Sequence, residues 1–108
     1  MRIEAPGLCD LQVNGYAGVD FNRPGLTHEQ LEAAATAVRR AGVTPFLPTL
    51  ITSSFDAFAA CAGALASWPS AAMLGIDQEG PYLSQTEARG AHPLAQLRPA
   101  TVDDFRRR

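Results

Sequence analysis

Short apolar segments alternate with one-sided helical segments along this chain, and this order constrains the fold more than any single residue does. The apolar segments cover residues 7–13, 43–51 and 72–76, and helical periodicity fills the intervals between them. Two consecutive strands separated by a helix usually lie parallel, because the helix carries the chain back to the starting edge of the sheet. The sequence therefore predicts an α/β fold with parallel strands and about three βα units.

The first helix has clear signals at both ends. Thr27 and Gln30 have the spacing of a capping box, in which each side chain bonds the backbone N–H of the other residue. Gly42 stands where a left-handed residue commonly terminates a helix. These signals predict a helix that begins after Thr27 and ends near Ala41.

Two further helices are indicated by capping residues. Ser53 or Ser54 is suited to cap a helix that ends before Pro69. Thr101 and Asp104 have similar capping spacing close to the end of the chain. We expect a helix at each of these places.

The second apolar segment, residues 43–51, contains Pro45 and Pro48. Proline has no N–H to donate and is rare inside a central strand. We therefore expect one of these prolines to mark the end of the strand.

Composition is typical of a soluble globular domain and argues against some partners. The chain has 108 residues, 46% hydrophobic and 19% charged, and a formal net charge of -2. Such a charge gives no basic field for nucleic acid or anionic membranes, and the arginines at 106–108 are interpreted as a solvated helix face. With no apolar leader or spanning segment, we expect a cytoplasmic location. Cys9 and Cys61 lack metal-binding spacing and are expected to be reduced core residues.

Functional groups of parallel α/β folds lie at the carboxyl ends of the strands. Glu79 follows the third apolar segment, and the loop after it contains His92. A carboxylate and an imidazole together suit zinc and other divalent transition metals. Spacing alone nevertheless favours a structural alternative, in which Glu79 caps backbone donors in the turn and His92 packs on the surface. Other polar residues at predicted strand ends are Gln12, Asn14, Thr49, Thr52, Asp77 and Gln78.

Common signatures of other enzyme classes are missing from the sequence. There is no GxSxG motif for a serine nucleophile, and Ser53 and Ser54 are better explained as helix caps. There is also no GxGxxG or GxxxxGK[ST] motif to bind nucleotide phosphates.

Three longer segments resemble one family, the N-acetylglucosamine-6-phosphate deacetylases of the amidohydrolase superfamily. The segments are PGLCDLQVNGYAGVDFN at residues 6–22, GVTPFLPTLITS at 42–53 and EGPYLSQTEARGAHP at 79–93. They occur in the order of the family and together account for most of the chain.

The resemblance implies part of a (β/α)8 TIM-type barrel, so that residues 1–108 form a truncated amidohydrolase barrel domain. The implied activity is carbon–nitrogen hydrolysis, converting N-acetylglucosamine 6-phosphate to glucosamine 6-phosphate and acetate. It implies one divalent metal ion, zinc or similar, with Glu79 as a ligand and His92 as a substrate-binding residue. Gln12 and Asn14 replace the His-x-His pair of many amidohydrolases, which fits a single-metal subgroup in which neither is a ligand.

The resemblance also implies that the ligand set is incomplete in this chain. The two later metal-binding histidines and the catalytic aspartate of the family would lie beyond residue 108, so no catalytic residue is expected within the chain. In addition, Asp77 and Gln78 stand where the family usually has His-Leu. One carboxylate cannot make a catalytic zinc site, which normally has about three protein ligands. We therefore expect the isolated chain to be inactive.

Two alternatives remain open on the sequence. The chain is also compatible with a small non-catalytic α/β binding module, or with an amidohydrolase that acts on another amide substrate. Full-length relatives are expected to form homo-oligomers. This chain is expected to self-associate, because about three strands leave a sheet edge and apolar surface uncovered.

Overall fold

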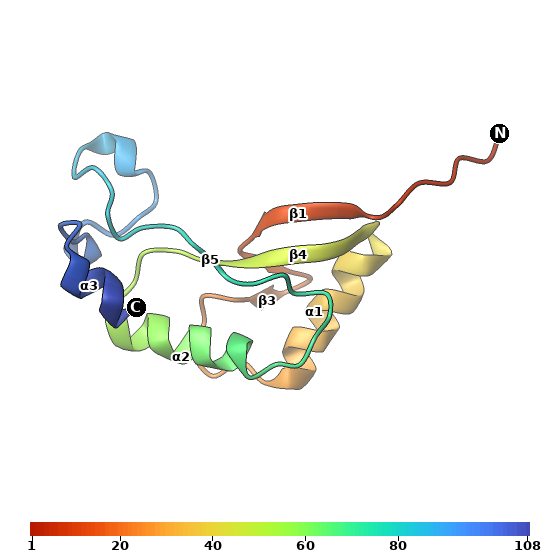
Figure 1. Cartoon of the computed structure of the whole chain (residues 1–108), viewed down its shortest axis with the longest axis horizontal. Coiled ribbons are helices and arrows are strands. Elements are labelled where there is room, and N and C mark those ends of the chain that lie inside the picture. The colour runs from red at the N-terminus through yellow and green to blue at the C-terminus, as the bar shows by residue number, and fades with distance from the viewer.

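The computed structural model describes residues 1–108, which form a parallel sheet and a small antiparallel hairpin (Figure 1). The parallel sheet has the order β1-β4-β5 and consists of β1 (Leu8–Val13), β4 (Val43–Leu50) and β5 (Asp77–Gln78). The hairpin consists of β2 (Gly15–Tyr16) and β3 (Val19–Asp20). The helices are α1 (His28–Arg40), α2 (Phe55–Ala66) and α3 (Val102–Arg107), with 3-10 turns at Glu87–Arg89 and Leu94–Gln96. The predicted α/β fold with parallel strands is confirmed.

Both ends of α1 are formed as predicted. Gln30 N donates to Thr27 Oγ1 at 3.2 Å, and Thr27 N donates to Gln30 Oε1 at 3.0 Å. Gly42 follows the helix with a φ of 95°, in the left-handed region that glycine adopts most easily. The helix buries one apolar stripe at helical spacing, formed by Leu31, Ala34, Ala35 and Val38.

The prediction that a proline ends the second strand is wrong. Strand β4 passes through both Pro45 and Pro48, and its ladder is irregular around them. The register against β1 shifts twice, and pairing on the other side is interrupted. Phe46 N donates to Ala72 O, and Leu50 O accepts from Glu79 N, so the intervening Pro48 nitrogen faces the interrupted side. A residue without an N–H is tolerated where the ladder bond is missing.

The predicted third strand begins later than the apolar pattern indicated. Within residues 72–76 only an isolated bridge forms, between Met73 and Phe46. Regular pairing begins at Asp77, opposite Thr49. The gap coincides with Pro48, which has no hydrogen to donate to this segment.

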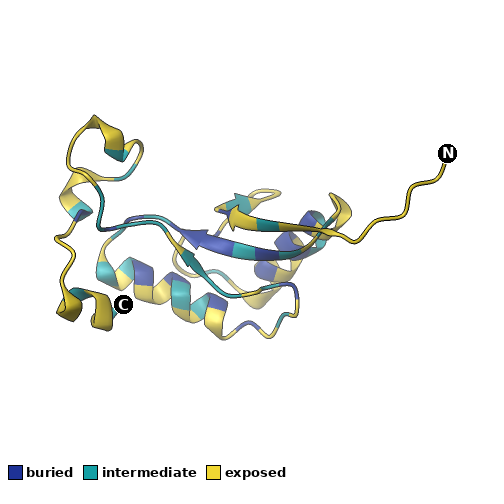
Figure 2. Ribbon diagram, turned by 45° about the horizontal axis from the view of Figure 1, so that its top comes forward, coloured by how far each residue is buried: buried dark blue, intermediate teal, exposed yellow.

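The three-stranded sheet is covered mainly on one face. Helices α1 and α2 lie on the same side of it (Figure 1), and the buried residues of β4 contrast with the exposed β1 (Figure 2). The prediction that Cys9 is a core residue is wrong, because it lies exposed on the edge strand β1. Cys61 in α2 is buried as predicted. Burial raises the pKa of the Cys61 thiol, and the negative charge of Asp20 raises it further.

The core lies between the sheet and the two helices. Phe21 and Phe46 stack at its centre, with ring centroids 6.1 Å apart. Leu31 of α1, Leu50 of β4 and Leu65 of α2 are also fully buried. Burial of these side chains fixes both helices against β4, since apolar burial is the main favourable term in folding.

Helix α3 is attached to the rest of the chain by polar contacts. Tyr82 Oη donates to Asp104 Oδ2 at 2.9 Å, and within the helix the C-cap residue Arg108 donates from Nε to the same oxygen at 3.2 Å. These bonds lower the pKa of the Asp104 carboxyl, with the Tyr82 bond as the larger cause. The interpretation of residues 106–108 as solvated is wrong for Arg108, whose side chain is only 6% exposed. Arg107 lies over the Phe55 ring, 3.9 Å from its centroid.

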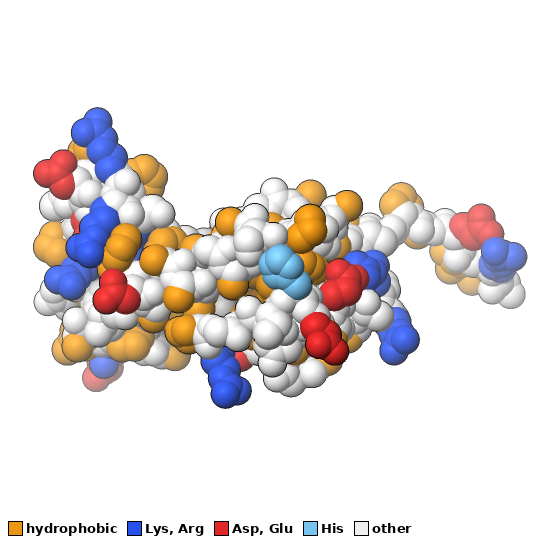
Figure 3. All heavy atoms as spheres, turned by 90° about the horizontal axis from the view of Figure 1, so that it is seen from below, with side chains coloured by type: hydrophobic (Ala, Val, Ile, Leu, Met, Phe, Trp, Pro, Cys, Tyr) orange, Lys and Arg blue, Asp and Glu red, His pale blue; other side chains and the backbone are white.

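Charged side chains do not gather into one field on the face drawn in Figure 3. Acidic and basic groups lie interspersed at both ends of that face. No helix is long and apolar enough to cross a membrane.

The two adjacent serines before α2 offer a direct test of its capping. Ala57 N donates to Ser54 Oγ at 3.2 Å, whereas Ser53 Oγ bonds only the Ser54 carbonyl. The Ser54→Ala variant is expected to lose about 1 kcal/mol of unfolding free energy in urea denaturation. The Ser53→Ala control is expected to stay within about 0.5 kcal/mol of the parent. Equal losses in both variants would contradict this assignment.

The exposed apolar residues predict self-association. Leu8, Leu11 and Leu74 are 68%, 65% and 58% exposed, and Val102 and Phe105 of α3 are 64% and 71% exposed. Light scattering after gel filtration is expected to give a mass that rises with concentration above 11.5 kDa. A monodisperse monomer with one cooperative thermal transition would contradict it.

Candidate functional site

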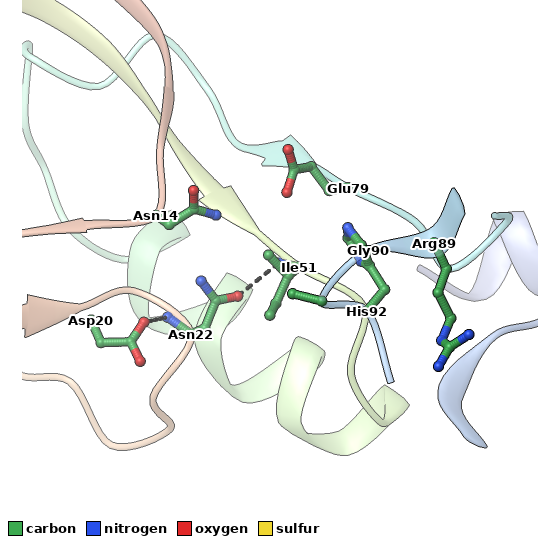
Figure 4. A pocket seen from close by; sticks show the side chains of 9 residues that line it. Asn14, Asp20, Asn22, Ile51, Glu79, Arg89, Gly90 and His92 are labelled. Carbon is green, nitrogen blue, oxygen red and sulfur yellow. Dashed lines mark hydrogen bonds between the residues drawn. The ribbon is translucent and has the colours of Figure 1, made fainter. Parts of the chain in front are cut away.

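A cavity of about 440 Å³ lies where the carboxyl ends of the parallel strands meet the loops that follow them (Figure 4). Its walls come from the end of β3 and from the segments after β1, β3, β4 and β5. This is the edge at which parallel α/β folds carry their functional groups. The lining residues are Asn14, Asp20, Asn22, Ile51, Glu79, Arg89, Gly90, Ala91 and His92.

The two site residues singled out from the sequence, Glu79 and His92, both line this cavity. Glu79 is placed by β5, because its N–H donates to Leu50 O at 2.9 Å and continues the pairing with β4. His92 arrives on the loop that follows. The Arg89 guanidinium extends away from Glu79 and Asn14 (Figure 4). The fold thus brings the carboxylate and the imidazole to one cavity, while their roles as metal ligand and substrate contact stay predictions.

A buried hydroxyl lies between the His92 ring and the Glu79 backbone. Thr52 Oγ1 lies 2.9 Å from His92 Nδ1 and 3.4 Å from the carbonyl oxygen of Glu79. Thr52 is only 3% exposed. The sequence showed Thr52 as one of several polar residues at a strand end, and its contact with His92 is visible only in the folded chain.

Gly80 provides the space that this arrangement needs. Its φ of 75° lies in the left-handed region, and a Cβ at this position would overlap with Thr52 Oγ1. A residue with a side chain would therefore suffer both backbone strain and a clash. This close approach explains why glycine follows Glu79.

Asn22 is a site residue that sequence reasoning missed. Its side chain donates from Nδ2 to Thr49 O at 3.0 Å and accepts at Oδ1 from Ile51 N at 2.7 Å. Its own N–H donates to Asp20 Oδ1 at 2.9 Å. Asn22 thereby fixes the loop after β3 to the end of β4, through contacts that no local motif indicates.

The polar residues at the end of β1 take different positions. Gln12 donates from Nε2 to Glu79 Oε1, so it contacts the candidate ligand directly. Asn14 lines the cavity. An amide that bonds the carboxylate orients it, and such outer contacts commonly support metal ligands. That neither residue is itself a ligand stays a prediction.

The residues of this chain do not form a complete metal site. No group of three or more His, Cys, Asp and Glu side chains lies close enough together to hold a metal ion. The other histidine, His28, bonds Ser67 Oγ at 3.1 Å through Nε2 and is not among the residues that line the cavity. Since a catalytic zinc normally has about three protein ligands, Glu79 would supply only part of such a set.

Asp77 and Gln78, where the resemblance implies His-Leu, form the short strand β5. They pair with Thr49 and Leu50, and neither lines the cavity. Their direct structural role is to continue the sheet up to Glu79.

Sequence comparison finds deacetylases of amino-sugar phosphates. The N-acetylglucosamine-6-phosphate deacetylases of Homo sapiens and Rattus norvegicus are 40% and 42% identical to this chain over 96% of its length. The N-acetylgalactosamine-6-phosphate deacetylase of Shewanella sp. is 41% identical over 92%. The chain spans about a quarter of the length of these curated relatives, 26%, 26% and 25%. No protein-family profile matches the chain.

Solved structures give the same result. The N-acetylglucosamine-6-phosphate deacetylase of Pasteurella multocida superimposes with a TM-score of 0.81 and 31% identity, over 94% of this chain and 27% of that one. The enzyme of Thermotoga maritima superimposes with a TM-score of 0.77 and 26% identity, over 95% of this chain and 28% of that one. The observed strands and helices thus match one segment of these enzymes.

Two glycines with positive φ allow the close approach at Gly80 to be tested. Gly90 has a φ of 59° with open space around its Cβ position, whereas Gly80 faces Thr52 Oγ1. Gly90 combines this φ with a ψ of -130°, a backbone conformation that other residues rarely adopt, so alanine there is expected to cost only the backbone strain, about 1–3 kcal/mol of unfolding free energy. Alanine at Gly80 adds the clash and is expected to cost at least about 1 kcal/mol more. Urea denaturation measures both, and equal losses would show that Thr52 does not constrain this turn.

Proposed function

We propose, from the correspondence of this chain with a segment of the N-acetylglucosamine-6-phosphate deacetylases, that it forms part of an enzyme that deacetylates amino-sugar phosphates. The reaction is hydrolysis of the acetamide of N-acetylglucosamine 6-phosphate to glucosamine 6-phosphate and acetate. The observation that carries the proposal is the match with these enzymes over 96% of the chain, which includes the segments that place Glu79 and His92 on one cavity.

The proposed architecture is part of a (β/α)8 barrel. Three parallel strands have their carboxyl ends at one cavity, as barrel strands do. Strands β1 and β5 lie at the edges of the sheet, where further parallel strands would continue it. The match with 27% of the Pasteurella multocida chain supports this extent of a barrel.

Within this site we propose that Glu79 is one ligand of a divalent metal ion. Its carboxylate lines the cavity and is oriented by Gln12. Because no group of three ligands exists here, the remaining ligands and the catalytic acid or base would come from outside residues 1–108. The isolated chain is therefore expected to release no acetate.

We propose that His92 contacts the substrate. Its ring lines the cavity beside Glu79, and Thr52 holds Nδ1 at 2.9 Å. A side chain held in this way is suited to bind a polar ligand in one orientation.

The galactosamine epimer is a second candidate substrate. One relative, from Shewanella sp., is named for N-acetylgalactosamine 6-phosphate and is 41% identical to this chain. Both sugars carry the same acetamide and phosphate, so an assay has to compare them directly.

A chimera tests the proposed function. The corresponding segment of the Pasteurella multocida enzyme is replaced by this chain, and acetate release is measured with both sugar phosphates. The chimera is expected to deacetylate the glucosamine derivative faster. The Glu79→Gln variant is expected to lose about 100-fold or more in kcat/KM, since even outer contacts of a metal ligand contribute about 10–100-fold.

The matched control is Glu87→Gln, which removes an equal charge from the exposed 3-10 turn of the same loop. It is expected to keep the activity of the parent chimera. A folded chimera without acetate release, or equal losses in both variants, would contradict the proposal. Acetate release by the isolated chain would contradict the incomplete site.

A further inference from the structure

The contact between Thr52 and His92 raises the question of which atom donates. The Thr52 hydroxyl has one hydrogen and two neighbouring atoms that could accept it, His92 Nδ1 at 2.9 Å, which accepts in one tautomer only, and Glu79 O at 3.4 Å. Hydrogen bonds from a hydroxyl usually span about 2.5–3.0 Å. The bond to His92 lies in this range, and the approach to Glu79 O lies well beyond it. If His92 Nδ1 donated instead, the hydroxyl hydrogen would have only the long contact with Glu79 O, so we assign this hydrogen to the bond with His92.

We propose that Thr52 is a positioning residue that holds neutral His92 with its proton on Nε2. When Nδ1 accepts from Thr52, the neutral ring carries its hydrogen on the other nitrogen. His92 then presents an N–H donor, and its ligand must offer an oxygen acceptor. The identification of this ligand as the substrate rests on the proposed function. Both the acetamide and the phosphate of an amino-sugar phosphate carry oxygen acceptors.

The free nitrogen of His92 is available for this role. His92 Nε2 has no hydrogen-bond partner within the protein, and it is not a buried unsatisfied atom. The residue is half-buried and lines the cavity. Nε2 is thus open to a bound molecule while Nδ1 is held.

The position of Thr52 is itself fixed from several sides. It is 3% exposed and lies just beyond the end of β4. The preceding residue, Ile51, donates its N–H to Asn22 Oδ1 at 2.7 Å. Gly80 leaves the space that Oγ1 occupies. A hydroxyl held in this way selects one ring orientation, as second-layer partners of functional histidines do.

Nitrogen NMR of the 108-residue chain tests this proposal. Spectra are recorded at increasing alkaline pH until the histidine nitrogen shifts stop changing, because both ring nitrogens carry a proton in the cation and the tautomer is defined only for the neutral ring. His92 is expected to show a protonated, pyrrole-type Nε2 and an unprotonated, pyridine-type Nδ1. The Thr52→Val variant keeps the shape but removes the hydroxyl, and its two His92 nitrogen shifts are expected to move toward each other as both tautomers become populated. The Thr52→Ser variant is expected to restore the parental shifts.

The other histidine provides an internal control. His28 bonds Ser67 and its shifts are expected to stay unchanged in every variant, which also reports that the chain is folded. A protonated Nδ1 in the parent chain, or unchanged His92 shifts in folded Thr52→Val, would overturn the proposal. Should Thr52→Val fail to fold, the parent and Thr52→Ser spectra still decide which nitrogen carries the proton. The NMR measurement uses the 108-residue chain alone. Its failure can therefore be distinguished from a failure of the chimera to release acetate.

Discussion

The parallel pairing of β4 with a strand on each side is the constraint on which the candidate site depends. Strand β1 pairs along one edge of β4 and β5 along the other. Because all three run in the same direction, their carboxyl ends meet and the segments beyond them converge. The last bond of this ladder, from Glu79 N to Leu50 O at 2.9 Å, fixes the backbone of the candidate ligand. Without this pairing, nothing in the fold would bring Glu79 close to Gln12.

The site is then organised by small polar contacts between loops. Asn22 fixes the loop after β3 to the end of β4, and Thr52 connects the segment after the same strand to His92. Gly80 allows the close approach, since a side chain there would overlap with the Thr52 hydroxyl. Each of these hydrogen bonds pairs polar groups whose burial without a partner would cost folding free energy. The cavity is thus shaped by hydrogen bonds at the end of the sheet and is supported by the apolar core beneath it.

The same fold leaves much of its apolar surface uncovered. Only 18 of 108 residues are buried, and the radius of gyration of 15.5 Å exceeds the roughly 13 Å typical of a compact domain of this length. The extended N-terminal segment contributes to this size (Figure 1). Helices cover one face of the sheet, while Leu8, Leu11 and Leu74 stay exposed on strands or next to them. Uncovered apolar surface of this kind is expected for a segment that matches about a quarter of a larger enzyme.

The sequence by itself determined the order of the three parallel strands and the helices, the helix caps and the family resemblance, but not the β2–β3 hairpin. Caps such as that of Thr27 are bonds between residues three apart, so they are readable from local spacing. Tertiary structure alone decided the passage of β4 through its prolines, the exposure of Cys9 and the contacts of Asn22 and Thr52. Those features depend on partners 27 to 40 residues away or on the place of a strand in the sheet. Local pattern does not encode which distant backbone will lie beside a residue, and that neighbour decides its burial and its hydrogen bonds.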